Sequence, residues 1–129
     1  MYYTKYNPKN GMIEWVINCE ENMLTENDRP NISGNYGAGA FYVDVAASPP
    51  LAKRRPPQNT RQSRRNIAAD GVETITLSAL PVPCRVDVDG ERYDVEDGIF
   101  EWGTRRAGEY SLRVTAFPFL DWEGTVTAG

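Results

Sequence analysis

CRVDVDGERYDV, residues 84–95, is the stretch that decides the fold class of this chain. Its apolar side chains alternate with charged ones on both sides of Asp89-Gly90, and they are Cys84, Val86, Val88, Tyr93 and Val95. Alternation with period two predicts strands that bury one face. Asp-Gly between two such runs is among the strongest signals for a two-residue hairpin turn. The stretch therefore predicts an antiparallel β-hairpin.

The same pattern extends over residues 70–129. Further strands are predicted at Glu73–Ser78, Ile99–Trp102, Glu109–Ala116 and Trp122–Thr127. We expect Asp97-Gly98 to join the hairpin to the next strand, and Ala107-Gly108 to precede another. One face of these strands would be apolar and would carry the apolar hairpin residues together with Ile75, Leu77, Tyr110, Leu112, Val114 and Ala116. The opposite face would be polar and would carry Arg85, Asp87, Arg92, Asp94, Arg113 and Thr115. Short strands with turns at this spacing predict a β-sandwich.

Residues 1–45 predict a smaller β-region. Two β-prone runs, Tyr2–Tyr6 and Met12–Cys19, flank the turn signal Asn7–Gly11 and predict an N-terminal hairpin. Phe41–Val45 predicts a third strand. One or two helical turns are expected within residues 20–27, and a Gly/Asn-rich loop within residues 31–40. We expect this region to dock on a larger assembly.

Residues 46–69 differ from both flanks in charge and proline content. They hold six basic and no acidic residues, whereas residues 1–45 sum to −3 and residues 70–129 to −7. Four prolines and the lack of apolar periodicity predict an extended linker. The cations could contact nucleic acid, but no aromatic residue lies between Pro49 and Ile67, and the chain is acidic overall. We favour a tether on an acidic protein surface through Arg54, Arg55, Arg61, Arg64 and Arg65.

The composition argues against an enzyme. With no histidine, the chain lacks the commonest general base and the commonest zinc ligand. Asp87–Glu91 lacks the spacing of a calcium loop, and Gly34–Gly39 lacks the lysine of a phosphate loop. We therefore expect no catalytic, cofactor or metal site.

Neither the cysteines nor the N-terminal residues suggest export. Cys19 and Cys84 lie far apart, and we interpret them as small buried apolar side chains rather than a disulfide. The sequence contains no stretch of about 18 apolar residues, so we expect no transmembrane helix. The N-terminus lacks the apolar core of a signal peptide, so we expect synthesis in the cytoplasm.

The segment Phe117–Trp122 carries more apolar surface than a turn needs. Turn chemistry would favour Gly, Asn or Asp there. Phe117, Phe119 and Trp122 would then either fold over the edge of the core or bind a partner subunit. The sequence leaves these two alternatives open.

Several motifs resemble those of a known family. They are Leu77–Cys84, Val86–Gly90, Gly108–Val114 and Trp122–Val126, together with Tyr2-Tyr3, Gly11–Ile13, Cys19 and Tyr42–Asp44. In this respect the chain resembles small virion proteins of tailed bacteriophages whose C-terminal domain is similar to Ig-like and PEGA-like β-sandwiches. In those modules a Val-Asp-Gly hairpin and a Gly-x-Tyr-x-Leu-x-Val strand recur.

The resemblance implies a structural, tail-associated virion protein: a tail tip, fibre or fibre-adaptor component. Its partners would be other virion subunits, in several copies of a symmetric assembly. A host-surface or carbohydrate-binding module and a capsid decoration protein remain as alternatives. The resemblance implies no catalytic residue.

Overall fold

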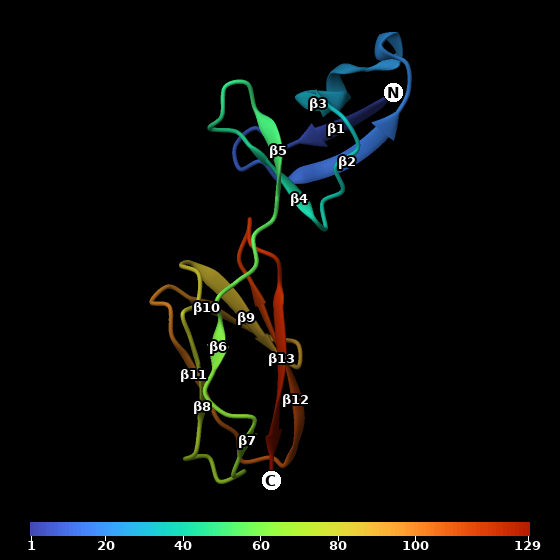
Figure 1. Ribbon diagram of the computed structural model, residues 1–129. Helices are drawn as coiled ribbons and strands as arrows, with labels where there is room; N and C mark the ends of the chain where they lie inside the picture. Colours follow the sequence, from blue (N-terminus) through green and yellow to red (C-terminus); the bar gives the residue numbers. More distant parts are fainter. The chain divides into compact units, whose positions relative to one another are not determined.

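The computed structural model describes residues 1–129 and is mainly β (Figure 1). Strands hold 45% of the residues, no α-helix is present, and the strands form several antiparallel sheets. The chain divides into two compact units, an N-terminal unit of Met1–Pro56 and a C-terminal unit of Pro57–Gly129. The prediction of a mainly β chain is confirmed.

The N-terminal unit begins with the expected antiparallel pair, β1 (Tyr2–Tyr6) and β2 (Ile13–Asn18). A third strand, β3 (Asn31–Ser33), pairs with the other side of β1. The prediction of a loop over residues 31–40 was therefore wrong at its start. Three residues are too short for alternation to reveal a strand.

The rest of the N-terminal unit packs against this sheet. Two 3-10 helices (Glu21–Met23 and Glu26–Asp28) lie where helical turns were expected. Strands β4 (Phe41–Asp44) and β5 (Leu51–Arg54) form a separate antiparallel pair. The small core consists of Tyr6, Ile13 and Val43, with Ile32, Tyr36, Phe41 and Val45 packed against it.

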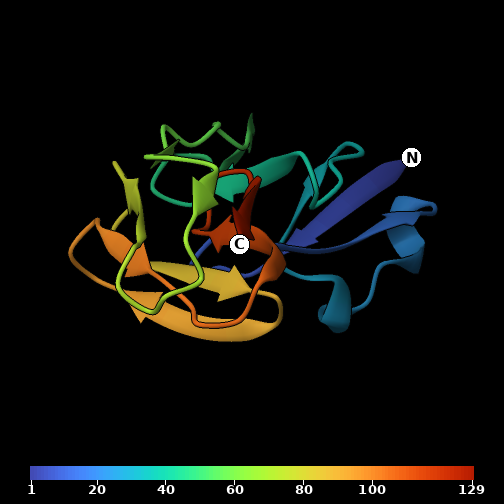
Figure 2. The same ribbon diagram turned by 90° about the horizontal axis from the view of Figure 1, so that it is seen from below.

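The C-terminal unit contains two sheets (Figure 1; Figure 2). One has the order β10-β9-β12-β13-β7 and the other the order β11-β8-β6. Their bounds are β6 Arg61–Gln62, β7 Asn66–Ile67, β8 Ile75–Ser78, β9 Cys84–Val88, β10 Glu91–Val95, β11 Phe100–Trp102, β12 Gly108–Thr115 and β13 Trp122–Ala128.

Both sheets contribute to one hydrophobic core. The predicted apolar face is buried along β8, β9 and β12, and five of its side chains are almost fully inaccessible: Ile75, Leu77, Val86, Leu112 and Val114. Burial of a Val, Leu or Ile side chain contributes about 1.5–3 kcal/mol, so this face supplies much of the unit's stability. The alternation in the sequence therefore identified the buried face correctly.

The two Asp-Gly turns behave differently. Asp89-Gly90 closes the expected hairpin of β9 and β10, with φ of 46° and 91°, the left-handed values that a type I′ turn requires. Asp97-Gly98 does not close a hairpin, because β10 pairs with β9 while β11 pairs with β8 in the other sheet. Its signal predicted a turn correctly, but a turn does not determine which strands pair.

The prediction that residues 46–69 form a linker is also corrected. The boundary between the two units falls at Pro56, within this segment. On one side β5 pairs with β4, and on the other β6 pairs with β8 and β7 runs parallel to β13. The segment is extended, but its backbone bonds within each unit and Ile67 is buried. Strands of two residues carry no periodicity, which is why the sequence did not reveal them.

Candidate protein-protein interface

The corner between β12 and β13 is built by local hydrogen bonds. The Phe119 N–H donates to the Ala116 carbonyl at 2.8 Å and closes a turn. The side-chain amide of Gln58 donates to the carbonyls of Val114 and Leu120, both at 2.9 Å. The Thr60 hydroxyl donates to the side-chain oxygen of Gln58, Oε1, at 2.8 Å and so orients the side-chain amide. A residue of the expected linker therefore braces this corner.

Phe119 and Trp122 are half-buried and pack against the core. Gly124 leaves room for the indole, since a Cβ at that position would lie 2.6 Å from the Trp122 ring. Both aromatic side chains therefore form part of the edge of the core. Phe117 is half-buried and lines a groove instead.

This groove, which we call the corner groove, lies between the loops that follow β8 and β12. It has a volume of about 510 Å³, and its apolar lining includes Pro81–Pro83, Phe117 and Phe119. Val82 is 62% exposed between its two prolines. Arg85, Asp94 and Glu96 add charges to the lining. An apolar floor with a polar rim has the composition of a protein-binding site.

The five arginines predicted to bind a partner are divided between the two units. Arg54 and Arg55 belong to the N-terminal unit, where the Arg54 guanidinium lies 5.2 Å from the Phe41 ring centre and Arg55 donates to the Ala38 carbonyl. Arg61, Arg64 and Arg65 belong to the C-terminal unit, and Arg64 pairs with Glu73. Four of the five are exposed, and Arg55 is half-buried.

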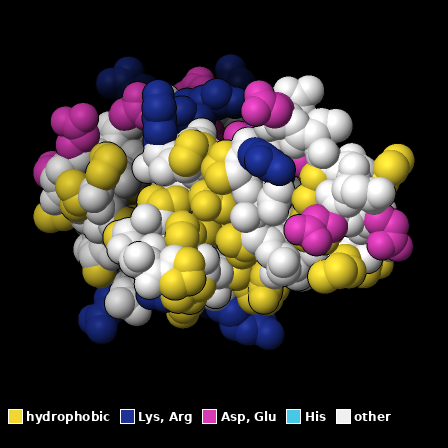
Figure 3. All heavy atoms as spheres, turned by 90° about the horizontal axis from the view of Figure 1, so that it is seen from above, with side chains coloured by type: hydrophobic (Ala, Val, Ile, Leu, Met, Phe, Trp, Pro, Cys, Tyr) yellow, Lys and Arg dark blue, Asp and Glu magenta, His cyan; other side chains and the backbone are white.

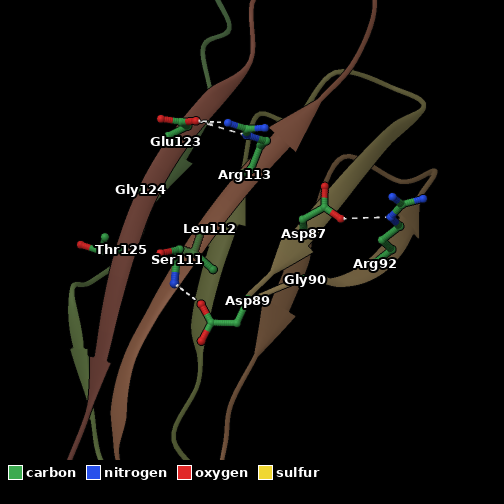
Figure 4. Close-up of a pocket in the computed structure, with 10 residues that line it drawn as sticks. All are labelled: Asp87, Asp89, Gly90, Arg92, Ser111, Leu112, Arg113, Glu123, Gly124 and Thr125. Carbon is green, nitrogen blue, oxygen red and sulfur yellow. Dashed lines mark hydrogen bonds and ion pairs between the residues drawn. The ribbon is translucent and has the colours of Figure 1, made fainter.

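The outer face of the five-stranded sheet carries a row of alternating charges (Figure 4). Arg92 stands opposite Asp87, Asp87 opposite Arg113, and Arg113 opposite Glu123, each pair on neighbouring strands. The Arg92 and Asp87 side chains approach to 3.7 Å, and Arg113 Nε donates to Glu123 at 3.1 Å. Opposite charges face each other across the strands and stabilise the register of the sheet.

An aromatic pocket of about 520 Å³ lies along β10 and β11. Tyr93, Trp102 and Tyr110 line it together with Glu91. The Trp102 and Tyr110 rings meet edge-on with centres 4.7 Å apart. The Tyr93 hydroxyl donates to Glu91 at 2.8 Å, and this bond raises the pKa of Tyr93. The sequence placed Tyr110 on the apolar face, and both Tyr110 and Trp102 pack against the core.

The N-terminal unit holds a buried acid. Asp28 is buried, and its carboxylate accepts hydrogen bonds from the Thr25 N–H at 2.9 Å and from Trp15 Nε1 at 3.2 Å. The bond from the Thr25 backbone is the main reason why the pKa of Asp28 lies below its usual value. Lys5 pairs with Glu14 at 3.0 Å beside the same indole. These contacts fix the 3-10 helices onto the sheet.

The structure contains few groups suited to covalent or metal chemistry. Cys19 and Cys84 are both free; Cys84 is buried as expected, whereas Cys19 is only half-buried. Burial raises the pKa of the Cys84 thiol, which disfavours the reactive thiolate. No group of three or more Cys, Asp or Glu side chains could hold a metal ion. No helix has the length and hydrophobicity needed to span a membrane.

Sequence reasoning missed Val82, Gln58 and the exposed apolar residues of the N-terminal unit, among them Met12 and Trp15. Pro81-Val82-Pro83 did carry a usable signal, because prolines end strand pairing and leave the residue between them in a loop. Figure 3 shows one face of the molecule, where hydrophobic side chains reach the surface among charges of both signs. Gln58, unlike Val82, has no flanking sequence signal that would have indicated its role.

Comparison of the chain with protein-family models, curated proteins and solved structures found no significant match.

Proposed function

We propose that this protein is a structural component of a tailed-phage virion that acts through protein–protein contacts. Its place would be in the tail: the tip, a fibre or a fibre adaptor. The N-terminal unit would dock on the particle, and the C-terminal unit would contact neighbouring subunits. The observation that carries the proposal is the corner groove, with Val82 held exposed between two prolines.

Large apolar side chains exposed on loops are better suited to contact with a partner than to solvent. Val82, Ile99 and Leu120 are large apolar side chains exposed on the loops that follow β8, β10 and β12. Burying apolar surface gains about 25 cal/mol per Å², so a partner that covers these loops is favoured. The groove also has charged groups at its rim, which give orientation to a contact.

We propose further that the C-terminal unit is an Ig-like sandwich. Support comes from the two motifs on which the resemblance rests. The Val-Asp-Gly hairpin lies in β9 and β10, and the Gly-x-Tyr-x-Leu-x-Val strand is β12. They are neighbours in one sheet, with Val86 opposite Val114 and Val88 opposite Leu112. Two sheets that enclose one core also suit this class.

The test is mass spectrometry of particles purified from the phage that encodes this chain, followed by a cryo-EM map of the tail. We expect the protein in a fixed ratio to the tail proteins after gradient purification. Its absence from particles, with abundant protein in the infected-cell lysate, would contradict a structural role. Its presence on the capsid shell alone would support the decoration alternative.

A host-surface glycan is the second candidate partner, because the pocket of Tyr93, Trp102 and Tyr110 combines aromatic side chains with a carboxylate. Sugar binding would be measured on the full chain by glycan array and calorimetry. Binding that is lost in Trp102→Ala, while the fold remains intact, would favour this candidate. No binding to any glycan would remove it.

A further inference from the structure

Strand β10 is an edge strand. It pairs with β9 on one side and has no partner strand on the other. An unpaired edge presents backbone N–H and C=O groups that can bind another strand. Its outward side chains on the exposed sheet face are Arg92 and Asp94, and both are largely exposed.

The register of the β9–β10 hairpin determines which backbone groups are unpaired. Val88 and Glu91 flank the two-residue turn, so they form a hydrogen-bonded pair. Alternate residues along β10 therefore bond to β9, namely Glu91, Tyr93 and Val95. The N–H and C=O groups of Arg92 and Asp94 point to the open edge.

The open-edge N–H and C=O groups of Arg92 and Asp94 can form hydrogen bonds with the same groups of a second copy of β10. If two β10 strands pair antiparallel about Tyr93, Arg92 stands opposite Asp94 of the second copy, and Asp94 opposite its Arg92. Both are hydrogen-bonded positions, so all outward backbone groups of the two residues find partners. The same register brings the two Tyr93 side chains together on the inner face, where aromatic pairs are favourable.

The charges match as well. Within one copy the row across the sheet is Glu123, Arg113, Asp87 and Arg92, and a second row holds Arg85 and Asp94. Joining the copies about Tyr93 places Asp94 and Arg85 of the second copy after Arg92. The alternation of sign then continues without interruption through the two-fold axis.

Neighbouring registers lose this match. A shift by two residues places Arg92 opposite itself in one direction, or Asp94 opposite itself in the other, and like charges directly opposite are unfavourable. A shift by one residue places residues of opposite sheet faces against each other. Arg92 and Asp94 also have unused capacity for ion pairs, because their contacts within the chain are long, at 3.7 and 3.9 Å.

We propose that the protein forms a symmetric dimer through β10, which joins the two five-stranded sheets into one continuous sheet. The occupant of the edge is a second copy of this chain, and the side chains that specify it are Arg92 and Asp94. The proposal goes beyond the virion role and does not depend on it. Because the interface is two short strands, the dimer forms at high local concentration, as in an assembly.

The test uses the full chain in sedimentation velocity over a wide concentration range, with Arg92→Asp and Asp94→Arg variants. Each reversal places like charges opposite each other twice, so each variant alone should dimerise about tenfold more weakly or worse. An equimolar mixture of the two variants should recover the dimer, because the carboxylate introduced in one variant then faces the guanidinium introduced in the other. Lys9→Asp, a substitution at an exposed residue of the N-terminal unit, changes the net charge by the same amount as Arg92→Asp and should behave as wild type.

A wild-type chain that stays monomeric at every concentration overturns the proposal. So does a dimer that neither reversal weakens, since its interface then lies elsewhere. A dimer weakened by both reversals but not restored in the mixture rejects the register about Tyr93. Thermal unfolding of each variant confirms that the C-terminal unit remains folded, and raised salt should weaken the wild-type dimer.

Discussion

Asp89 Oδ1 accepts a hydrogen bond from the Ser111 backbone N–H at 2.7 Å, and the Asp89 N–H donates to the Ser111 carbonyl at 3.0 Å. The turn of the β9–β10 hairpin is thereby tied to the adjacent strand β12. Asp89 also adopts a left-handed φ of 46°. One residue therefore shapes the turn and extends the pairing of the sheet beyond the end of β9.

Asp89→Ala should lower the free energy of unfolding of the C-terminal unit by about 1–2 kcal/mol. Alanine removes the acceptor for the Ser111 N–H and disfavours the left-handed φ. Asp89→Asn is the matched control, because asparagine tolerates this φ and keeps an acceptor oxygen. Urea denaturation of the two variants measures the difference, and equal losses would show that the Asp89–Ser111 bond contributes nothing.

Gly124→Ala should destabilise the C-terminal unit by about 1–3 kcal/mol, because the new methyl group would overlap the Trp122 ring. In an ordinary strand the same change stabilises, so the sign is diagnostic. The penalty should fall in a Trp122→Ala background, as measured by a double-mutant cycle, and the remainder reflects the Gln62 side-chain oxygen, which would lie 2.9 Å from the new methyl group. A penalty that is unchanged in that background would show that the Trp122 indole does not pack over Gly124.

The fragment Pro57–Gly129 should fold alone, with a well-dispersed proton–nitrogen NMR spectrum. The fragment Asp70–Gly129 lacks β6, β7, the buried Ile67 and the Gln58 brace. Loss of a buried isoleucine alone costs about 2 kcal/mol or more, so the shorter fragment should be far less stable. The stability of the longer fragment with Ile67→Ala should lie between the stabilities of the two fragments. Equal stability of the two fragments would remove β6 and β7 from the folding unit.

Acid should weaken the N-terminal unit through Asp28. Its pKa is lower in the folded chain than its usual value of 3.8, so its contribution is fully present above that value and is lost as pH falls through the folded pKa. Asp28→Asn should remove this dependence and lower the melting temperature at neutral pH. The measurement is the NMR signal of the Trp15 indole N–H followed from pH 7 downwards. A signal unaffected by acid and by the substitution would contradict the hydrogen bond to Asp28.

The strands that the sequence predicted well share one property: they bury one face and are long enough for alternation to show. β9 and β12 are examples, and their inward residues were identified individually. The short strands β3, β6 and β7 depend on backbone pairing with strands distant in the sequence, which local composition does not encode. Such pairings are decided by tertiary contacts.

The candidate interface was predictable only in part. Excess apolar surface at Phe117–Trp122 singled out the corner as a candidate, but it did not indicate which side chains face inward. Trp122 packs inward because Gly124 leaves space for it, and Gln58 binds the corner from a segment that was predicted to be a linker. Val82 joins the site from another loop, so its role depends on packing rather than on its own sequence motif.

Assembly into a virion through the corner groove is tested most directly by quantitative mass spectrometry of particles made with wild-type protein, with Val82→Asp and with Val72→Asp. Val72 is 82% exposed in the loop after β7, at the other end of the C-terminal unit, and makes the matched control (Figure 1). Wild type and Val72→Asp should be incorporated equally, and Val82→Asp should be depleted although it folds. Incorporation of Val82→Asp at the wild-type ratio, or absence of the wild-type protein from particles, would contradict this role of the groove.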